Sequence, residues 1–248
     1  MTGFLLLKRS VTAVFRNFDD ALAISGLLWV ALTAVIVFIS SFAPEITLAQ
    51  DAPVSTGSLL WLIVPNLAAL IVGIWVAVEW HRFALLGVRP TTIFPQLHMA
   101  QTLSYLGHSL KLIVLMVVIA FAIVFVATII GTFSGVLQPL LAVVPAITLV
   151  GAFLIFYRLS PILPAAAIGQ SMTLKQAWQR TQSIQKEIYQ AVFLLVLATL
   201  CAQLPMLVLP GELIALLYSL IVGWIGLMVG VSLLSAIYEM SEGQQGQP

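Results

Sequence analysis

The stretch that decides the fold is residues 110–130, LKLIVLMVVIAFAIVFVATII, in which Lys111 is the single charged residue. About 20 consecutive apolar residues are enough for a helix to cross the hydrocarbon core of a membrane. Five further stretches have similar length and polarity, so the sequence predicts six transmembrane helices. Their approximate bounds are residues 21–43, 57–78, 110–130, 136–157, 188–209 and 213–238.

The composition of the whole chain points to the same class of protein. Of its 248 residues, 61% are hydrophobic and 8% are charged, and the mean hydropathy is +1.12. A soluble domain carries roughly a quarter charged residues, and a soluble fold this apolar would expose large apolar patches. The net charge of +1 offers no basic excess for nucleic acid, and Cys201, the single cysteine, excludes an internal disulfide.

The distribution of basic residues predicts the orientation of the chain. With six spans, all ten lysines and arginines lie on the same side of the membrane as the N-terminus, whereas the opposite loops carry Glu45, Asp51 and Glu212. Cytoplasmic loops of membrane proteins are enriched in lysine and arginine. We therefore expect a multi-pass protein of the bacterial cytoplasmic (inner) membrane, with both termini in the cytoplasm.

The chain divides into segments of one integral membrane domain, and amphipathic helices are expected on the cytoplasmic side. The segments are an interfacial helix (1–20), spans 1 and 2 (21–78), a cytoplasmic segment (79–109), spans 3 and 4 (110–157), a cytoplasmic segment with an interfacial helix (158–187), spans 5 and 6 (188–238) and a flexible tail (239–248).

Two of the cytoplasmic segments have the periodicity of amphipathic helices. In residues 173–188, apolar residues recur at helical spacing, and basic and amide side chains fill the other face. Thr173 and Gln176 form a capping-box pattern at its start. Residues 7–18 likewise separate an apolar stripe from a basic one. We expect both helices to lie on the inner membrane surface, where Trp178 would reach the headgroups and the basic faces would meet anionic lipid.

A weaker copy of this pattern at residues 94–108 suggests an internal repeat. Each of the three amphipathic segments precedes a pair of predicted spans, and Ala13, Ala100 and Ala177 align roughly when the copies are superimposed. Internal repeats are common in membrane proteins. The sequence is consistent with three units, each an interfacial helix followed by a helical hairpin, but any three hairpins with basic inner loops would look partly alike.

One run of residues resembles a known type of membrane protein. The run is Tyr157-Arg158-Leu159-Ser160 through Pro164-Ala165-Ala166, followed by Leu174-x-x-Ala177-Trp178-x-x-Thr181. It resembles a pattern in poorly characterised bacterial multi-pass proteins and is similar to the membrane domain fused to some glycerophosphodiester phosphodiesterases. The resemblance covers about a third of the chain and implies a fold type and a membrane location. It carries no enzymatic activity over, because the chain has no soluble region long enough for the catalytic domain.

The densest cluster of ionisable residues is Glu79-Trp80-His81-Arg82, at the inner end of the second span. One interpretation is a site for a lipid headgroup or a substrate, in which Arg82 grips phosphate and Glu79 or His81 relays a proton. The alternative is an interfacial anchor with Arg82 extended to the headgroups. Glu79 lies closest to the hydrocarbon and needs a partner. The candidate lipid or ligand contacts are Glu79, His81, Arg82, Arg158 and Trp178.

A stripe of small residues marks the sixth span. Ser219, Gly223, Gly226 and Gly230 lie at helical spacing, and such stripes let helices approach closely. The partner could be another span of this chain or another protein. The stripe is therefore a candidate surface for helix packing or for a partner.

No catalytic, cofactor or metal motif emerges from the sequence. The spacing of His81, His98 and His108 matches no metal-binding pattern. The pair Asp19-Asp20 is explained by the helix dipole, which favours acidic residues in a first turn. We therefore expect no enzyme, no cofactor and no metal.

Two classes of function are consistent with this predicted fold. The first is a non-enzymatic scaffold or assembly factor that holds a partner complex or lipids, favoured by the sparse polar interior and the small-residue stripe. The alternative is a transporter or lipid-handling protein with a headgroup or substrate site at the cytoplasmic end of span 2. It is favoured by prolines within the spans, although the spans contain no obvious carboxylate for ion coupling. The expected partners are membrane lipids, with anionic headgroups on the cytoplasmic side, and a membrane protein, but not nucleic acid.

Overall fold

A computed structural model describes residues 2–42, 56–90, 96–134 and 143–243 of the chain. The regular structure in these ranges is helical throughout, which confirms the predicted all-α class. The helices are α1 (Gly3–Arg16), α2 (Phe18–Phe42), α3 (Thr56–Leu86), α4 (Met99–Ser134), α5 (Val144–Leu159), α6 (Ile162–Ala167), α7 (Leu174–Arg180), α8 (Gln185–Gln203), the 3-10 helix η2 (Leu204–Leu207) and α9 (Glu212–Gly243).

Five segments in the described ranges are long and apolar enough to cross a membrane. They are Phe18–Ile39 in α2, Ile63–Leu86 in α3, Met99–Gly131 in α4, Gln185–Leu207 across α8 and η2, and Glu212–Gly243 in α9. The chain is thus built as a multi-pass membrane protein. In the region of the predicted fourth span, α5 has 16 residues. At 1.5 Å per residue it is about 24 Å long, which is short of the roughly 30 Å of hydrocarbon. Residues 136–142 of that predicted span lie outside the described residues.

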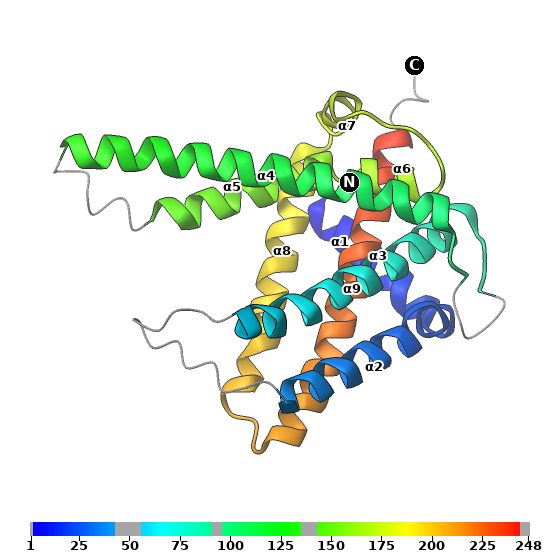
Figure 1. Cartoon of the computed structure of the whole chain (residues 1–248). Helices are drawn as coiled ribbons and strands as arrows, with labels where there is room; N and C mark the ends of the chain where they lie inside the picture. The colour runs from blue at the N-terminus through cyan, green and yellow to red at the C-terminus, as the bar shows by residue number, and fades with distance from the viewer. Residues whose placement is uncertain (1, 43–55, 91–95, 135–142, 244–248) are drawn as a thin grey trace.

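The long helices form three hairpins that diverge from a common base (Figure 1). The helix α2 packs against α3, and α4 packs against α5, while α8 and α9 are joined by a short turn that includes η2. In the view of Figure 1, the α4–α5 hairpin extends to the left and the α8–α9 hairpin extends downward. The turn before α9 contains Gly211 with φ of +76°, a conformation that glycine adopts without strain.

The common base of the hairpins holds the buried core. Every residue of α6 is buried, and its sequence ILPAAA lets neighbouring helices approach because three of its side chains are single methyl groups. The core also takes in the inner end of α3, with Trp80 fully buried, and the half of α9 that starts at Trp224. The opposite ends of the hairpins are uncovered, as the exposed side chains of Phe121 and Ile147 show.

Helix α1 lies across α8 and α9 at this base. Its buried face is centred on Leu6, Ser10 and Val14 and packs against other helices of the chain, so Val14 is the one fully buried residue of the predicted apolar stripe. The apolar side chain of Phe15, which was expected on the same stripe, is exposed. At the start of the helix, a Cβ atom on Gly3 would lie 2.6 Å from the carbonyl oxygen of Glu187, so this close approach requires glycine.

The amphipathic helix predicted for residues 173–188 is divided in two. Its start is confirmed, because Thr173 and Gln176 form the complete capping box. However, α7 ends at Arg180 and α8 begins at Gln185. The break follows from Thr181, whose hydroxyl lies 3.0 Å from the carbonyl oxygen of Arg158 in another helix. A threonine side chain that binds carbonyl groups in this way competes with the helical backbone pattern.

Three other predicted boundaries differ from the structure. Residues 99–108 are not a separate interfacial helix, because α4 runs unbroken from Met99 to Ser134. Likewise, α3 continues to Leu86, so eight residues of the predicted cytoplasmic segment belong to it. Finally, α9 extends to Gly243, so residues 239–243 of the predicted flexible tail are helical. Residues 94–95 and 244–248 lie outside the described residues.

Candidate functional site

The polar side chains of the base form contacts between helices that are distant in sequence. Arg158, at the end of α5, is buried, and its guanidinium lies 3.6 Å from the centre of the Trp178 ring on α7. Its Nη2 atom donates a hydrogen bond of 3.0 Å to the Trp178 carbonyl. Such stacking of an arginine on an aromatic face is favourable and stronger where water is excluded. Two of the predicted lipid or ligand contacts, Arg158 and Trp178, therefore bind each other, and the Arg158 guanidinium is engaged within the protein.

Another contact links α3 to α9. The Nδ1 atom of His81 lies 2.8 Å from the hydroxyl oxygen of Ser235, and the His81 side chain is fully buried. The Tyr105 ring of α4 lies beside it, with 5.7 Å between ring centroids. A fully buried ring cannot touch a lipid headgroup, so His81 is not placed as the predicted lipid contact. It connects three helices of the core instead.

The Glu79 carboxylate, which was expected to need a partner near the hydrocarbon, is paired with a histidine. The Nδ1 atom of His98, just before α4, lies 2.7 Å from the Glu79 carboxylate, and both side chains are largely shielded from solvent. Arg82 lies one turn further along α3, and its Nε atom is buried without a hydrogen-bond partner among the described residues. Glu79 and Arg82 therefore remain near each other at the inner end of α3, with the carboxylate already bound.

Two ion pairs attach short helices to the end of α9. Arg9 of α1 pairs with Glu239, and Arg180 of α7 pairs with Glu242. Exposed ion pairs contribute little stability singly, typically below about 1 kcal/mol. Their partners are separated by 230 and 62 residues, so no local spacing in the sequence could have revealed them. They were missed by the sequence analysis, as was the Ser235 partner of His81.

The small-residue stripe of α9 is divided between two environments. A Cβ atom on Gly223 would lie 2.9 Å from Cζ2 of Trp29, so this glycine lets α2 approach. The Trp29 indole donates a hydrogen bond of 2.9 Å to the Leu220 carbonyl at the same crossing. By contrast, Cβ atoms on Gly226 and Gly230 would meet nothing within 4 Å. Ser219 is exposed. Part of the stripe therefore packs internally, and the rest faces outward.

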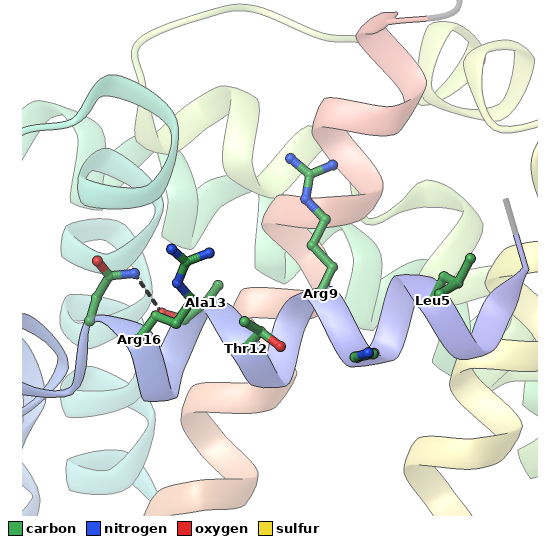
Figure 2. A pocket seen from close by; sticks show the side chains of 7 residues that line it. Leu5, Arg9, Thr12, Ala13 and Arg16 are labelled. Atoms are coloured by element: carbon green, nitrogen blue, oxygen red, sulfur yellow. Dashed lines mark hydrogen bonds between the residues drawn. The ribbon is translucent and has the colours of Figure 1, made fainter.

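The outward face of α1 is basic. A shallow hollow on this face is lined by Lys8, Arg9 and Arg16 together with Leu5, Thr12, Ala13 and Asn17. Figure 2 shows the guanidinium groups of Arg9 and Arg16 on the same side of the helix, with Arg9 beside the C-terminal half of α9. Lys8 and Arg16 of the predicted basic stripe are thus exposed, whereas Arg9 is paired with Glu239.

The described residues offer little to hold a metal. Within the four described ranges, no three side chains of histidine, cysteine, aspartate or glutamate come close enough to form a metal site. The arrangement at the base connects helices, and Lys8 and Arg16 add exposed positive charge to it. Comparisons with protein-family models, with curated proteins and with solved structures gave no match.

Proposed function

We propose that the chain is a non-enzymatic scaffold or assembly factor of a bacterial cytoplasmic membrane, which holds a partner complex or lipids. One observation carries this proposal. Contacts between distant helices gather at the base, whereas the apolar hairpins that leave the base are largely uncovered. The contrast is sharpest for α4, whose most apolar segment has no buried residue, while more than half of the corresponding segment of α9 is buried.

This contrast suits a scaffold for a physical reason. The polar and aromatic contacts of Arg158, His81 and Glu79 hold the base in one arrangement. Uncovered membrane helices fixed to such a base present apolar surface to lipid or to the helices of another protein. Association of helices within a membrane depends on close packing, and the outward-facing Gly226 and Gly230 permit it.

The proposal includes six spans and both termini in the cytoplasm. The three hairpins support this arrangement. The helices α1 and α7 precede the first and third hairpins, which supports a repeated unit, whereas the described residues before the second hairpin hold no separate helix. The likeness to the membrane domain fused to some glycerophosphodiester phosphodiesterases is part of the same proposal and agrees with a role without catalysis.

The test is purification of the full chain in native lipid nanodiscs, followed by mass spectrometry of proteins and lipids. We expect a membrane protein in stoichiometric amount with the wild type and its loss with Gly226→Leu, because leucine would fill the space that close packing needs. The matched control is Gly73→Leu in α3, where an added Cβ atom also meets nothing within 4 Å.

Two outcomes would contradict the scaffold proposal. One is a wild-type preparation that contains no stoichiometric protein but one strongly enriched small molecule, which would favour the transport alternative. The other is a partner that is retained equally by Gly226→Leu and Gly73→Leu, because the outward glycines would then have no part in its binding.

A further inference from the structure

A groove with a volume of about 480 Å³ lies between α1, α3 and α9. Helix α9 packs against both α1 and α3, so it forms the floor, and the other two helices form the walls. The volume falls within the range of about 300–1,000 Å³ that is usual for sites of small ligands. The groove lies on the base of the molecule, beside the basic face of α1 that Figure 2 shows.

One charged side chain of this groove has no partner. Arg89, in the segment that follows α3, lines the groove and makes no hydrogen bond or ion pair with any described residue. An acceptor supplied from outside the chain would satisfy this guanidinium.

The charge of the groove is positive. Its ionisable side chains are Arg9, Arg89 and Glu239, and Glu239 is paired with Arg9. One unpaired positive charge therefore remains, on Arg89. A guanidinium binds phosphate oxygens in a bidentate manner, and such charge-assisted hydrogen bonds are stronger than those between neutral groups.

Part of the remaining lining is apolar. Phe83 and Ala84 of α3, Ala13 of α1 and Ala236 of α9 form this part of the surface, beside the neutral polar side chains of Ser10, Asn17, Ser232 and Ser235. A ligand with a phosphate and an apolar portion would match both parts, whereas a free inorganic anion would leave the apolar part unfilled.

We propose that the groove between α1, α3 and α9 binds the phosphodiester headgroup of an anionic phospholipid. Arg89 donates hydrogen bonds to the phosphate oxygens, and Phe83 contacts the glycerol and the start of an acyl chain. This site is distinct from the Glu79–His98 pair. The inference goes beyond the scaffold proposal and does not depend on a protein partner.

The experiment is a titration of the purified full chain with phosphatidylglycerol in detergent, followed by native mass spectrometry to obtain Kd. We expect Arg89→Gln to weaken binding about tenfold, because a charged hydrogen bond to phosphate is lost. Arg89 is exposed, so its substitution leaves the buried core unchanged.

The matched control is Arg16→Gln, which removes the same charge from α1 but does not line the groove. We expect this variant to bind phosphatidylglycerol as the wild type does. Equal weakening by Arg16→Gln and Arg89→Gln would overturn the proposal, because the attraction would then be a diffuse effect of charge. Wild-type protein that retains no phosphatidylglycerol would overturn it as well.

Two further probes distinguish the source of the phosphate. Phosphatidylcholine carries the same phosphodiester next to a quaternary ammonium group, so its headgroup has no net charge, and we expect it to bind more weakly than phosphatidylglycerol. Inorganic phosphate should compete poorly, since it leaves the apolar lining uncovered. Displacement of the lipid by inorganic phosphate at equal concentration would overturn the assignment of a lipid and indicate a site for the free anion.

Discussion

Thr181 illustrates how one hydroxyl group connects separate parts of the base. Its oxygen lies 2.8 Å from the carbonyl oxygen of Ala177, in its own helix, and 3.0 Å from that of Arg158, in α5. The side chain is fully buried. Because the same residue ends α7 and fixes it to α5, its contribution to stability exceeds that of an ordinary helical threonine.

We therefore predict that Thr181→Val lowers the free energy of unfolding by about 1–2 kcal/mol, since valine has the same shape but leaves the Arg158 carbonyl without this donor. The measurement is the midpoint of thermal unfolding in detergent. The control is Thr199→Val, because the exposed Thr199 hydroxyl binds only the Leu195 carbonyl of its own helix. Equal midpoints for the two variants would show that the contact with Arg158 has no stabilising role.

At the scale of elements, the crossing of α2 and α9 depends on two tryptophans and a glycine. The indole of Trp29 on α2 donates to the Leu220 carbonyl of α9, and the indole of Trp224 on α9 donates to the Ser25 hydroxyl of α2 at 2.7 Å. Gly223 leaves room for the Trp29 ring between these hydrogen bonds. Each helix therefore donates one indole hydrogen bond to the other, around the close contact between Gly223 and Trp29.

Alanine substitutions in the stripe are expected to have opposite effects. In an exposed helix, alanine is favoured over glycine by up to about 1 kcal/mol, so Gly226→Ala should raise the unfolding midpoint slightly. Gly223→Ala should lower it, because the new methyl group would lie 2.9 Å from the Trp29 ring, which is rigid and already hydrogen-bonded.

Thermal unfolding of the two alanine variants, side by side in one detergent, checks this prediction. The double variant Gly223→Ala with Trp29→Phe should recover part of the loss, because the smaller ring leaves space for the methyl group. A Gly223→Ala variant at least as stable as Gly226→Ala would contradict close packing of α2 on α9.

At the scale of the whole molecule, the base and the ends of the hairpins should lie on opposite sides of the membrane. Ser171 is an exposed residue of the base, between α6 and α7, and Glu212 begins α9 at the far end of its hairpin. The excess of lysine and arginine at the base places it in the cytoplasm under the proposed orientation.

Cysteine labelling of intact cells tests this orientation. In a Cys201→Ser background, which removes the natural thiol, we predict that a membrane-impermeant maleimide labels Glu212→Cys from outside. The Ser171→Cys variant should react only after the membrane is permeabilised. Labelling of Ser171→Cys in intact cells would reverse the orientation, and equal labelling of both positions would contradict the single span, Gln185–Leu207, that separates them.

Features that depend on neighbouring residues could be predicted from the sequence. The apolar stretch at residues 110–130 implied a helix long enough for a membrane, and α4 contains it. The capping box of Thr173 and Gln176 was recognised because its two residues are three positions apart. Both signals are local, so neighbouring residues alone determine the backbone conformation.

Features that join distant residues could not be predicted in this way. Glu79 clearly needed a partner, but nothing in the sequence selected His98, and His81 was expected to face lipid although it binds Ser235 inside the core. The outward direction of Gly226 and the inward direction of Gly223 likewise depend on where α2 lies.

By itself, the sequence determined that this protein is a set of apolar helices with its positive charge at one end, because hydropathy and charge are properties of single residues summed over short windows. Only the tertiary structure decided which faces of those helices are buried and which polar groups meet. The reason is that each such contact depends on the relative positions of two or more helices, which are fixed by packing at the base around α6, Trp80 and the inner half of α9.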